Sequence, residues 1–377
     1  MAKRKALFMI CLLAVAFGFT ALVVLFAEKK EKTEGLLCVT SFYPVQLLAE
    51  SVSAGADGVT VRNLTENHSG CIHDYTLTTQ DMRLLSEAEL FLINGGDMEL
   101  FLEKTASEYK DLRIVDTSEG FSFLEGVGHA HDHGEEKEHP EECTDPTHHH
   151  EEEYDEEHVE PCTDPTHHHE EEQDFHDGHS RAINAHIWMD IDGYLLQLER
   201  VEEAFVDADP AQAVLYHKNA EACREGLTVL KEEYEAAKTT LAGKETVVFH
   251  EGFVYLLNML GVESVHCLAM DSDTQIAAGE AAEIMEECRL HGISVLFAEE
   301  AYEETVTDTF GRELDGRVVI LDPVTGAVTS GNATSGAMES GSSENGQESG
   351  DKKNGVAQYC TRMHRNLEKI LEAYGVR

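Results

Sequence analysis

The stretch that decides the fold is LLCVTSFYPVQLLAESV, residues 36–52. It begins with an apolar run that predicts a buried strand over Leu36–Ser41, and it continues with a helix from about Pro44. The same order of strand and helix recurs along the chain at short intervals. Strands that alternate with helices in this way predict an α/β fold, in which helices cover both faces of a parallel sheet.

The remaining strands and helices fall into two groups, which predict two α/β lobes. In the first group, strands are expected at Val59–Leu64, Glu89–Asn94 and Leu112–Ser118, and helices near Thr79–Ser86, from Asp97 and from Asp192. In the second group, strands are expected at Thr246–His250, 262–268, Ser294–Glu299 and Arg317–Asp322, and helices up to Leu260, over about Ala277–His291 and at 358–375. In the last helix, one face is expected to be core, formed by Met363, Leu367, Ile370 and Leu371.

A helix of unusual length is predicted between the two groups, from Asp209-Pro210 to about Leu241. Proline is tolerated in the first turn of a helix, and at 1.5 Å per residue this helix would span about 45 Å. It is expected to be a rigid spacer between the lobes. The expected domains are a leading segment 1–33, a first lobe 34–208 with a loop at 126–183, a linking helix 209–242, and a second lobe 243–377 with a flexible Gly/Ser-rich insertion at 326–357.

The leading segment has the features of an export signal. Basic residues at 3–5 precede an unbroken apolar run, Ala6–Ala27. That run is also long enough to cross a bilayer, which needs about 20 residues. A cleaved signal and a retained membrane anchor are both open, and in either case the rest of the chain is expected outside the cytoplasm, in the periplasm or on the cell surface. We find no good lipoprotein motif, because Cys11 lies inside the run and Cys38 follows two leucines.

The composition limits the classes of ligand and of scaffold. The formal net charge is −45, which excludes nucleic acid as a partner and favours cations. A hydrophobic content of 42% is sufficient for a real core. Eight cysteines follow Cys11, too few for a disulfide scaffold in 377 residues. Their pairing cannot be deduced, and metal binding or one disulfide are both open for Cys143 and Cys162.

Residues 129–179 are rich in metal-binding side chains, with thirteen histidines and 20 Asp or Glu but one Lys. The sequence CTDPTHHHEEE occurs there twice, at Cys143–Glu153 and Cys162–Glu172. So polar a segment is expected to be a mobile loop, and histidine tracts suit Zn²⁺ better than Ca²⁺ or Mg²⁺. The expected accessory ligands are His129, His131, His133, His148, His149, His150, His167, His168, His169, His176 and His179. Zinc capture, sensing, buffering and a plain solvated linker are open alternatives, and the repeat favours several binding sites over one.

Three further histidines are expected at strand ends or in the loops that follow strands. His73 lies in CIHDYTLT, His186 in NAHIWMD and His250 in VVFHEGFVYL. Ligands of open parallel sheets bind outside the carboxyl ends of the strands. By its position alone, each histidine is better explained as a surface or core-edge side chain than as a ligand.

In combination, these motifs resemble the zinc-type solute-binding proteins of bacterial ABC importers, whose relatives bind manganese. The resemblance covers the chain from about Leu36 to Tyr374. The segments that carry it, in order, are SGCIHDYTLTTQDMRLLSEAELFLINGGDMELFLEK, NAHIWMDI, FHEGFVYLLNMLGV, LFAEEAYEE, VILDPV and QYCTRMHRNLEKIL.

The resemblance implies that His73, His186 and His250 bind the metal in the cleft between the lobes. Manganese-type relatives carry a carboxylate where this chain has His250, so the resemblance favours Zn²⁺ over Mn²⁺, without excluding Mn²⁺ or other divalent transition metals. Where some relatives supply a fourth ligand, this chain has Thr325 or Ile72. The fourth ligand therefore stays open between water, a side chain of the loop, and two weaker candidates, Glu251 and Glu299. A structural role is favoured for Glu299.

The expected function is an extracytoplasmic receptor, not an enzyme, that captures Zn²⁺ and delivers it to the permease of an ABC importer. The protein is expected to be a monomer. The alternatives are a metal-buffering or adhesin-like surface protein and a manganese-type receptor. A zinc hydrolase also uses three histidines and an open position, but its HExxH helix would need a histidine where Val254 stands.

Overall fold

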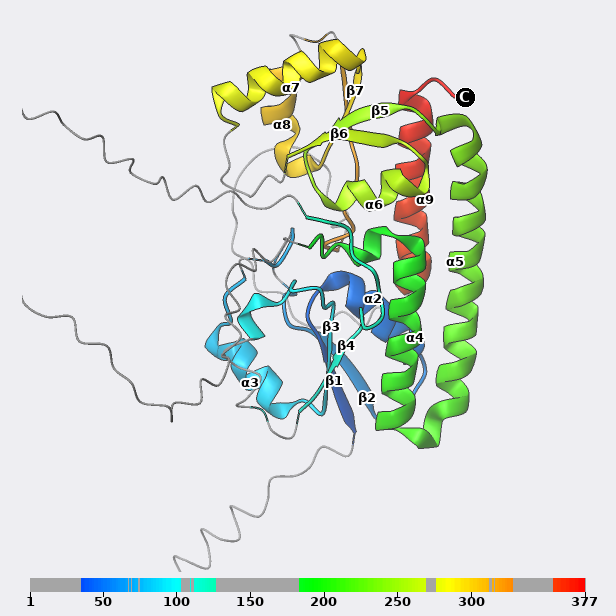
Figure 1. Cartoon of the computed structure of the whole chain (residues 1–377). Helices are drawn as coiled ribbons and strands as arrows, with labels where there is room; N and C mark the ends of the chain where they lie inside the picture. The colour runs from blue at the N-terminus through cyan, green and yellow to red at the C-terminus, as the bar shows by residue number, and fades with distance from the viewer. Residues whose placement is uncertain are drawn as a thin grey trace, which may run out of the picture. The chain divides into compact units, whose positions relative to one another are not determined.

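The computed structural model describes residues 35–66, 68, 70–73, 75–102, 109, 112–126, 183–268, 276–311, 314, 316–327 and 355–376. Two parallel four-stranded sheets form the frame of this part of the chain (Figure 1). The first has the order β2-β1-β3-β4, from β1 (Leu36–Thr40), β2 (Val59–Asn63), β3 (Leu90–Ile93) and β4 (Arg113–Asp116). The second repeats that order as β6-β5-β7-β8, from β5 (Glu245–Val248), β6 (Glu263–Cys267), β7 (Val295–Ala298) and β8 (Arg317–Ile320). The expected fold class is confirmed.

The order of the strands indicates where a ligand would bind at the edge of each sheet. In the first sheet Cys38 of β1 lies opposite Val61 of β2 and Leu90 of β3. The chain moves outward from β1 to β2 and then crosses back to β3, so β1 and β3 form the topological switch point. The same crossing occurs between β5 and β7. A ligand site is therefore expected outside the carboxyl ends of β1 and β5.

Local signals in the sequence explain most helix boundaries in the first lobe. Helix α2 (Tyr43–Val52) has its proline in the first turn, and α3 (Thr79–Glu87) begins with a capping box between Thr78 and Asp81. The helix expected from Asp97 does not begin there. Instead, a short 3-10 turn covers Leu100–Leu102.

Backbone geometry is the reason for that difference. Gly95, Gly96 and Asp97 have φ values of 83°, 63° and 60°, which a right-handed helix cannot adopt. A Cβ on Gly95 would lie 1.9 Å from Asp116 Oδ1, and one on Gly96 would lie 2.6 Å from the ring of Phe123. These contacts require glycine and turn the chain at the end of β3.

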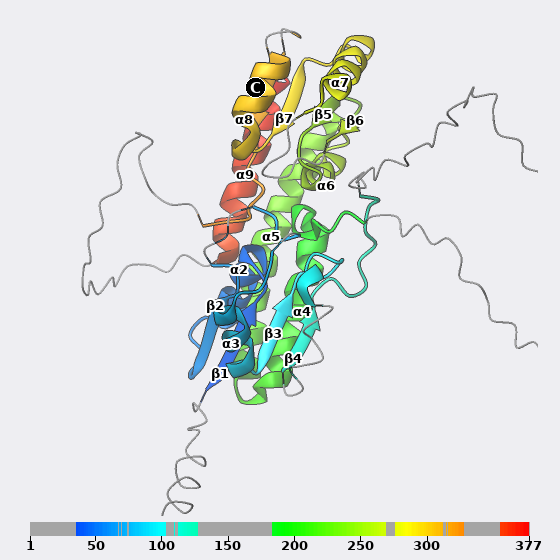
Figure 2. The ribbon, with the colours of Figure 1, turned by 90° about the vertical axis from the view of Figure 1, so that its left-hand side faces the viewer.

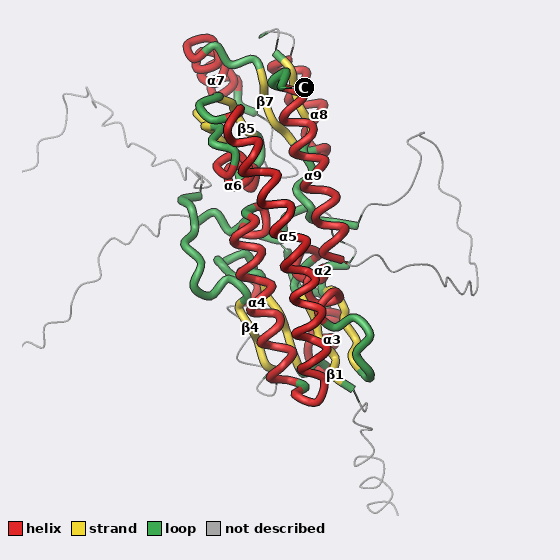
Figure 3. The backbone as a smooth tube through the Cα atoms, turned by 90° about the vertical axis from the view of Figure 1, so that its right-hand side faces the viewer, coloured by secondary structure: helices red, strands yellow, loops and turns green. Residues whose placement is uncertain are grey.

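Three long helices form a layer beside the sheets, in which the middle helix packs against the other two, as Figures 2 and 3 show from two sides. They are α4 (Ile191–Ala208), α5 (Ala213–Leu241) and α9 (Gly355–Ala373). Helix α5 is the expected linking helix, and it starts after a separate 3-10 turn, Pro210–Gln212. Its buried side chains recur every three or four residues from Tyr216 to Leu241, so one continuous stripe faces the core.

The second lobe is completed by α6 (Gly252–Met259), α7 (Ala278–His291) and the short α8 (Glu303–Val306), with a 3-10 turn at Glu300–Tyr302 and a π-helical turn at Thr307–Gly311. Another 3-10 turn, Ile187–Met189, directly precedes α4. The expected core face of the terminal helix is confirmed, with Met363, Leu367 and Ile370 buried and Leu371 half-buried. The buried guanidinium of Arg362 pairs with Asp322 at 2.5 Å and ties α9 to the end of β8.

Parts of several expectations lie outside the described residues: the leading segment, the histidine-rich loop, and most of the insertion expected at 326–357. The last three residues of that insertion are helical, because α9 begins at Gly355, where a Cβ would lie 2.5 Å from Leu47 O. Among the described helices, none combines the length and the apolar character needed to cross a bilayer.

Candidate metal centre

The three predicted histidines lie together, although 113 residues separate His73 from His186 and 64 separate His186 from His250. The imidazole rings of His73 and His186 are 5.4 Å apart between centroids, and those of His186 and His250 are 4.8 Å apart. His250 follows the carboxyl end of β5, and His73 lies in the loop after β2. The arrangement matches the expectation that ligands gather outside the carboxyl ends of parallel strands.

His186 is held by the segment that follows the histidine-rich loop. The next three residues form a buried 3-10 turn at Ile187–Met189. Within it, Trp188 donates from Nε1 to the Pro323 carbonyl at 2.8 Å, and its own carbonyl accepts from Tyr359 at 2.6 Å. These contacts join the segment to residues after β8 and to α9. His186 itself is 1% exposed, so its orientation is set by a closed packing environment.

Asn184 orients the His186 ring. Its amide Nδ2 donates to the Glu251 carbonyl at 2.8 Å, so its Oδ1 faces His186 and accepts from Nδ1 at 2.9 Å. The proton of the neutral imidazole must then lie on Nδ1, and the lone pair of Nε2 is left for a ligand. Metal-binding histidines are commonly fixed in this way by an acceptor on the far nitrogen.

His250 is enclosed by the start of α6. The side chain lies 5.0 Å from the Phe253 ring, and its Nδ1 has no hydrogen-bond partner among the described residues. Gly252 packs directly against the two imidazoles, since a Cβ there would lie 2.8 Å from His250 Cε1 and 3.0 Å from His186 Cδ2. Glycine at position 252 therefore lets both rings approach the same point.

The loop after β2 brings a thiol into the cluster as well as His73. Cys71 Sγ lies 3.0 Å from His186 Nε2 and 3.3 Å from His250 Nε2. The loop is stabilised by the buried Ile72 and by a 2.9 Å contact between His68 Nε2 and the Cys71 carbonyl. Sequence reasoning missed Cys71. The signal for it was the sequence CIH, in which a second metal-binding side chain stands two residues before the predicted ligand.

Two overlapping groups among the described residues have the spacing of metal ligands. One comprises Cys71, His186 and His250, and the other His73, His186 and Glu251. Of the two glutamates considered as fourth ligands, Glu251 is the one that lies beside the histidines. Its Oε1 is 3.5 Å from His186 Nδ1. Glu299 belongs to neither group.

Burial keeps His186 and His250 neutral. Burial, and secondarily the neighbouring imidazoles of His250 and His73, hold the pKa of His186 well below its usual range. Burial and the proximity of His73 lower the pKa of His250 to about 3. By contrast, burial and then Asp322 raise the pKa of Glu299 to about 7. Two imidazoles that are uncharged at neutral pH can bind a transition metal without first losing a proton.

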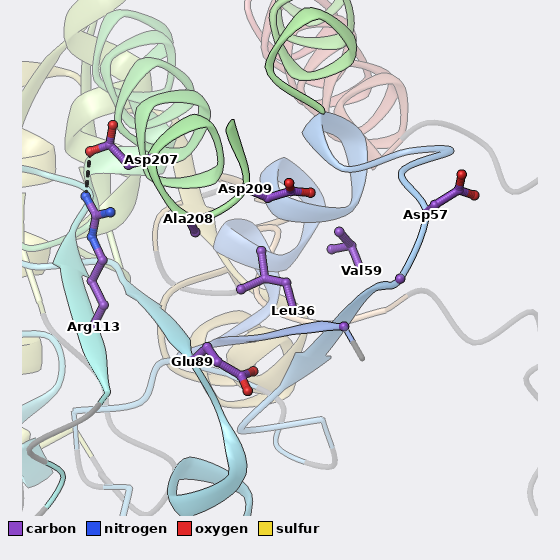
Figure 4. A pocket seen from close by; sticks show the side chains of 10 residues that line it. Leu36, Asp57, Val59, Glu89, Arg113, Asp207, Ala208 and Asp209 are labelled. Atoms are coloured by element: carbon purple, nitrogen blue, oxygen red, sulfur yellow. Dashed lines mark hydrogen bonds and ion pairs between the residues drawn. The ribbon is translucent and has the colours of Figure 1, made fainter. Parts of the chain in front are cut away.

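A hollow of about 680 Å³ lies at the opposite, amino-terminal edge of the first sheet (Figure 4). It is lined by the first residues of β1, β2 and β4 and by carboxylates. Three of the four lining carboxylates already have structural partners. Asp207 pairs with Arg113 at 2.8 Å, Glu89 accepts from the Leu37 amide, and Asp209 accepts from Tyr216. This hollow is therefore not a candidate metal centre.

Known proteins are similar to this chain in sequence and in fold. The family model of the periplasmic zinc-uptake complex component A matches residues 38–373. The zinc-binding protein AdcA of Streptococcus pyogenes is 24% identical over 86% of this chain and 56% of its own length, so the chain spans little more than half of that relative. The high-affinity zinc uptake system protein ZnuA of Brucella abortus is 27% identical over 76% of this chain and 84% of its own.

Among solved structures, the metal-dependent lipoprotein YcdH of Bacillus subtilis has the same fold. Its TM-score is 0.61 at 18% identity, covering 90% of this chain and 98% of that one. At this level of identity the likeness concerns the fold, and it agrees with the two parallel-sheet lobes described above.

Proposed function

This chain belongs to the family of periplasmic zinc-uptake component A proteins, and we propose that it is an extracytoplasmic receptor that binds Zn²⁺ through His73, His186 and His250. The observation that carries the proposal is the convergence of buried imidazoles. The Nε2 atoms of His186 and His250 both lie beside one point, the Cys71 sulfur, and the ring of His73 lies next to that of His186.

The chemistry of these donors favours zinc as the cargo. Neutral imidazole suits Zn²⁺ and its neighbours among the transition metals, whereas Mn²⁺ prefers carboxylate and other oxygen ligands. At the third position the chain supplies His250 in place of a carboxylate. Two relatives are named for zinc binding and for high-affinity zinc uptake, which supports the same choice of metal.

The partner in this proposal is the permease of an ABC importer, which receives the ion in the periplasm or at the cell surface. The apolar run Ala6–Ala27 serves as an export signal or as an anchor to the membrane. The receptor acts as a monomer, and the histidine-rich segment 129–179 captures or buffers further ions. We propose residues 34–208 and 243–377 as the two lobes, with the linking helix between them.

Zinc titration by calorimetry tests the proposal. The chain from Glu34 onward is compared with the same chain lacking 129–179. One tight binding event that survives the deletion, while several weaker events disappear, supports a receptor with an accessory capture loop. Weak multiple binding in the longer chain, with none after the deletion, would assign the zinc to the loop and reject the receptor site.

Replacement of one ligand tests the assignment of the site. His250→Ala removes a buried donor and should abolish the tight event. The matched control is His364→Ala, which removes a half-exposed histidine that pairs with Glu233 on the surface. Equal zinc affinity of the two variants would contradict the assignment of His250.

A further inference from the structure

We propose that the Cys71 thiolate is the fourth ligand, so that the ion is held by one sulfur and three imidazoles. The inference rests on the proposed zinc-receptor function and specifies its site more closely. It changes the expected selectivity, because a thiolate is a soft donor that binds Zn²⁺ and Cd²⁺ well and Mn²⁺ poorly.

The spacing of the donor atoms supports this assignment. With Zn–S near 2.3 Å and Zn–N near 2.0–2.1 Å, the S···N edge of a tetrahedron is about 3.5 Å. The observed edges are 3.0 Å from Cys71 Sγ to His186 Nε2 and 3.3 Å to His250 Nε2. A widening of a few tenths of an ångström therefore places an ion in contact with all three atoms.

The orientation of His186 decides between Cys71 and Glu251. Its Nδ1 donates to Asn184 at 2.9 Å, and the Glu251 carboxylate lies on this same side of the ring, 3.5 Å from Nδ1. Cys71 lies on the other side, next to Nε2. The lone pair that can hold the ion thus faces the thiol, whereas Glu251 supports the protonated nitrogen and stays outside the ligand shell.

The fold supplies Cys71 and His73 from one loop. The two residues are separated by the buried Ile72, which is 1% exposed, and a backbone hydrogen bond from Tyr75 N to Ile72 O closes the turn at 3.1 Å. One anchored turn therefore presents a sulfur and an imidazole to the two histidines of the other segments. Cys71 already groups with His186 and His250, whereas His73 groups with His186 and Glu251, so in this proposal His73 turns toward the ion as the fourth donor.

Cobalt substitution of the full-length chain tests the inference directly. With one equivalent of Co²⁺, bound sulfur gives a thiolate-to-cobalt charge-transfer band in the near ultraviolet, which nitrogen and oxygen ligands do not give. The band is expected in the wild type and absent in Cys71→Ser. The matched control is the double variant Cys143→Ser with Cys162→Ser, which removes the thiols of the histidine-rich repeats and should keep the band.

Zinc affinity gives a second readout. Loss of outer-shell partners alone costs about 10–100-fold in metal affinity, so Cys71→Ser should weaken tight zinc binding by more than about 100-fold. The ratio of zinc to manganese affinity should fall in parallel. Unchanged thermal unfolding of the metal-free variant separates this effect from misfolding.

The outcomes distinguish the inference from the function on which it rests. If His250→Ala loses tight zinc binding while Cys71→Ser keeps both the affinity and the cobalt band, the receptor stands and the cysteine ligand is rejected. If the band disappears in the repeat double variant instead, the sulfur comes from the loop and the inference is also rejected. If the wild type lacks a tight zinc site, the proposed function itself fails.

Discussion

Gly252→Ala is expected to disable the metal centre without disturbing the fold. Gly252 is the first residue of α6 and has an ordinary negative φ, so alanine fits the backbone. The added methyl group, however, would lie 2.8 Å from His250 Cε1 and 3.0 Å from both His250 Nδ1 and His186 Cδ2. The substitution would therefore displace the side chains of two proposed ligands at once, without replacing either residue.

The magnitude follows from these distances. Ordinary contacts of a Cβ begin at 3.4 Å, so the rings must move by about 0.4–0.6 Å from the methyl group. They cannot retreat freely, because Phe253 lies 5.0 Å from the His250 ring and Trp188 lies 5.0 Å from the His186 ring. Metal–ligand distances tolerate about ±0.2 Å. We expect a loss of about 10–100-fold in zinc affinity, comparable to the loss of an orienting partner, or about 1.4–2.7 kcal/mol.

The assay is competitive zinc titration against a chelator, with thermal unfolding of the metal-free protein measured alongside. The matched control is Gly279→Ala in the first turn of α7, where an added Cβ meets nothing within 4 Å. The control should bind zinc like the wild type. If Gly252→Ala binds zinc within twofold of the wild type, the two rings are not confined as the structure indicates, and the reasoning is refuted.

Three other measurements check the remaining contacts. Asn184→Ala should weaken zinc binding about 10–100-fold in the same titration, whereas Asn184→Asp, which keeps an acceptor for His186 Nδ1, should retain most of the affinity. In the metal-free protein, NMR titration should find His250 neutral at about pH 5, since its pKa is lowered to about 3. The contribution of neutral His250 to stability is present above about pH 6.5 and is lost as the pH falls toward 3. A His250 side chain that titrates near pH 6.5 would contradict its burial. Arg362→Ala leaves Asp322 without its buried partner. It should lower the free energy of unfolding, measured by urea denaturation, by about 2–3 kcal/mol. A change below about 0.5 kcal/mol would show that the ion pair does not contribute to stability.

The sequence by itself determined the fold class, and it predicted three histidines whose rings lie together in the structure. Apolar runs such as Leu36–Ser41 have the length and composition of buried strands, and their regular alternation with helices leaves a parallel sheet as the simplest solution. Helical spacing of apolar residues was enough to place Met363 in the core. Local patterns carry this information because strand and helix formation depend on near neighbours along the chain.

Tertiary structure alone decided which side chains meet and how the chain turns between elements. The helix expected from Asp97 is absent because Gly95 and Gly96 must pass close to Asp116 and Phe123 of other segments. Cys71 contacts His186 although 115 positions separate them in the sequence. No local sequence pattern encodes a contact between residues so far apart. The lone pair of His186 is likewise directed by Asn184, which a further contact to Glu251 orients. Contacts between distant segments arise only when the sheets and helices pack, so the ligand geometry could not be predicted before the fold was known.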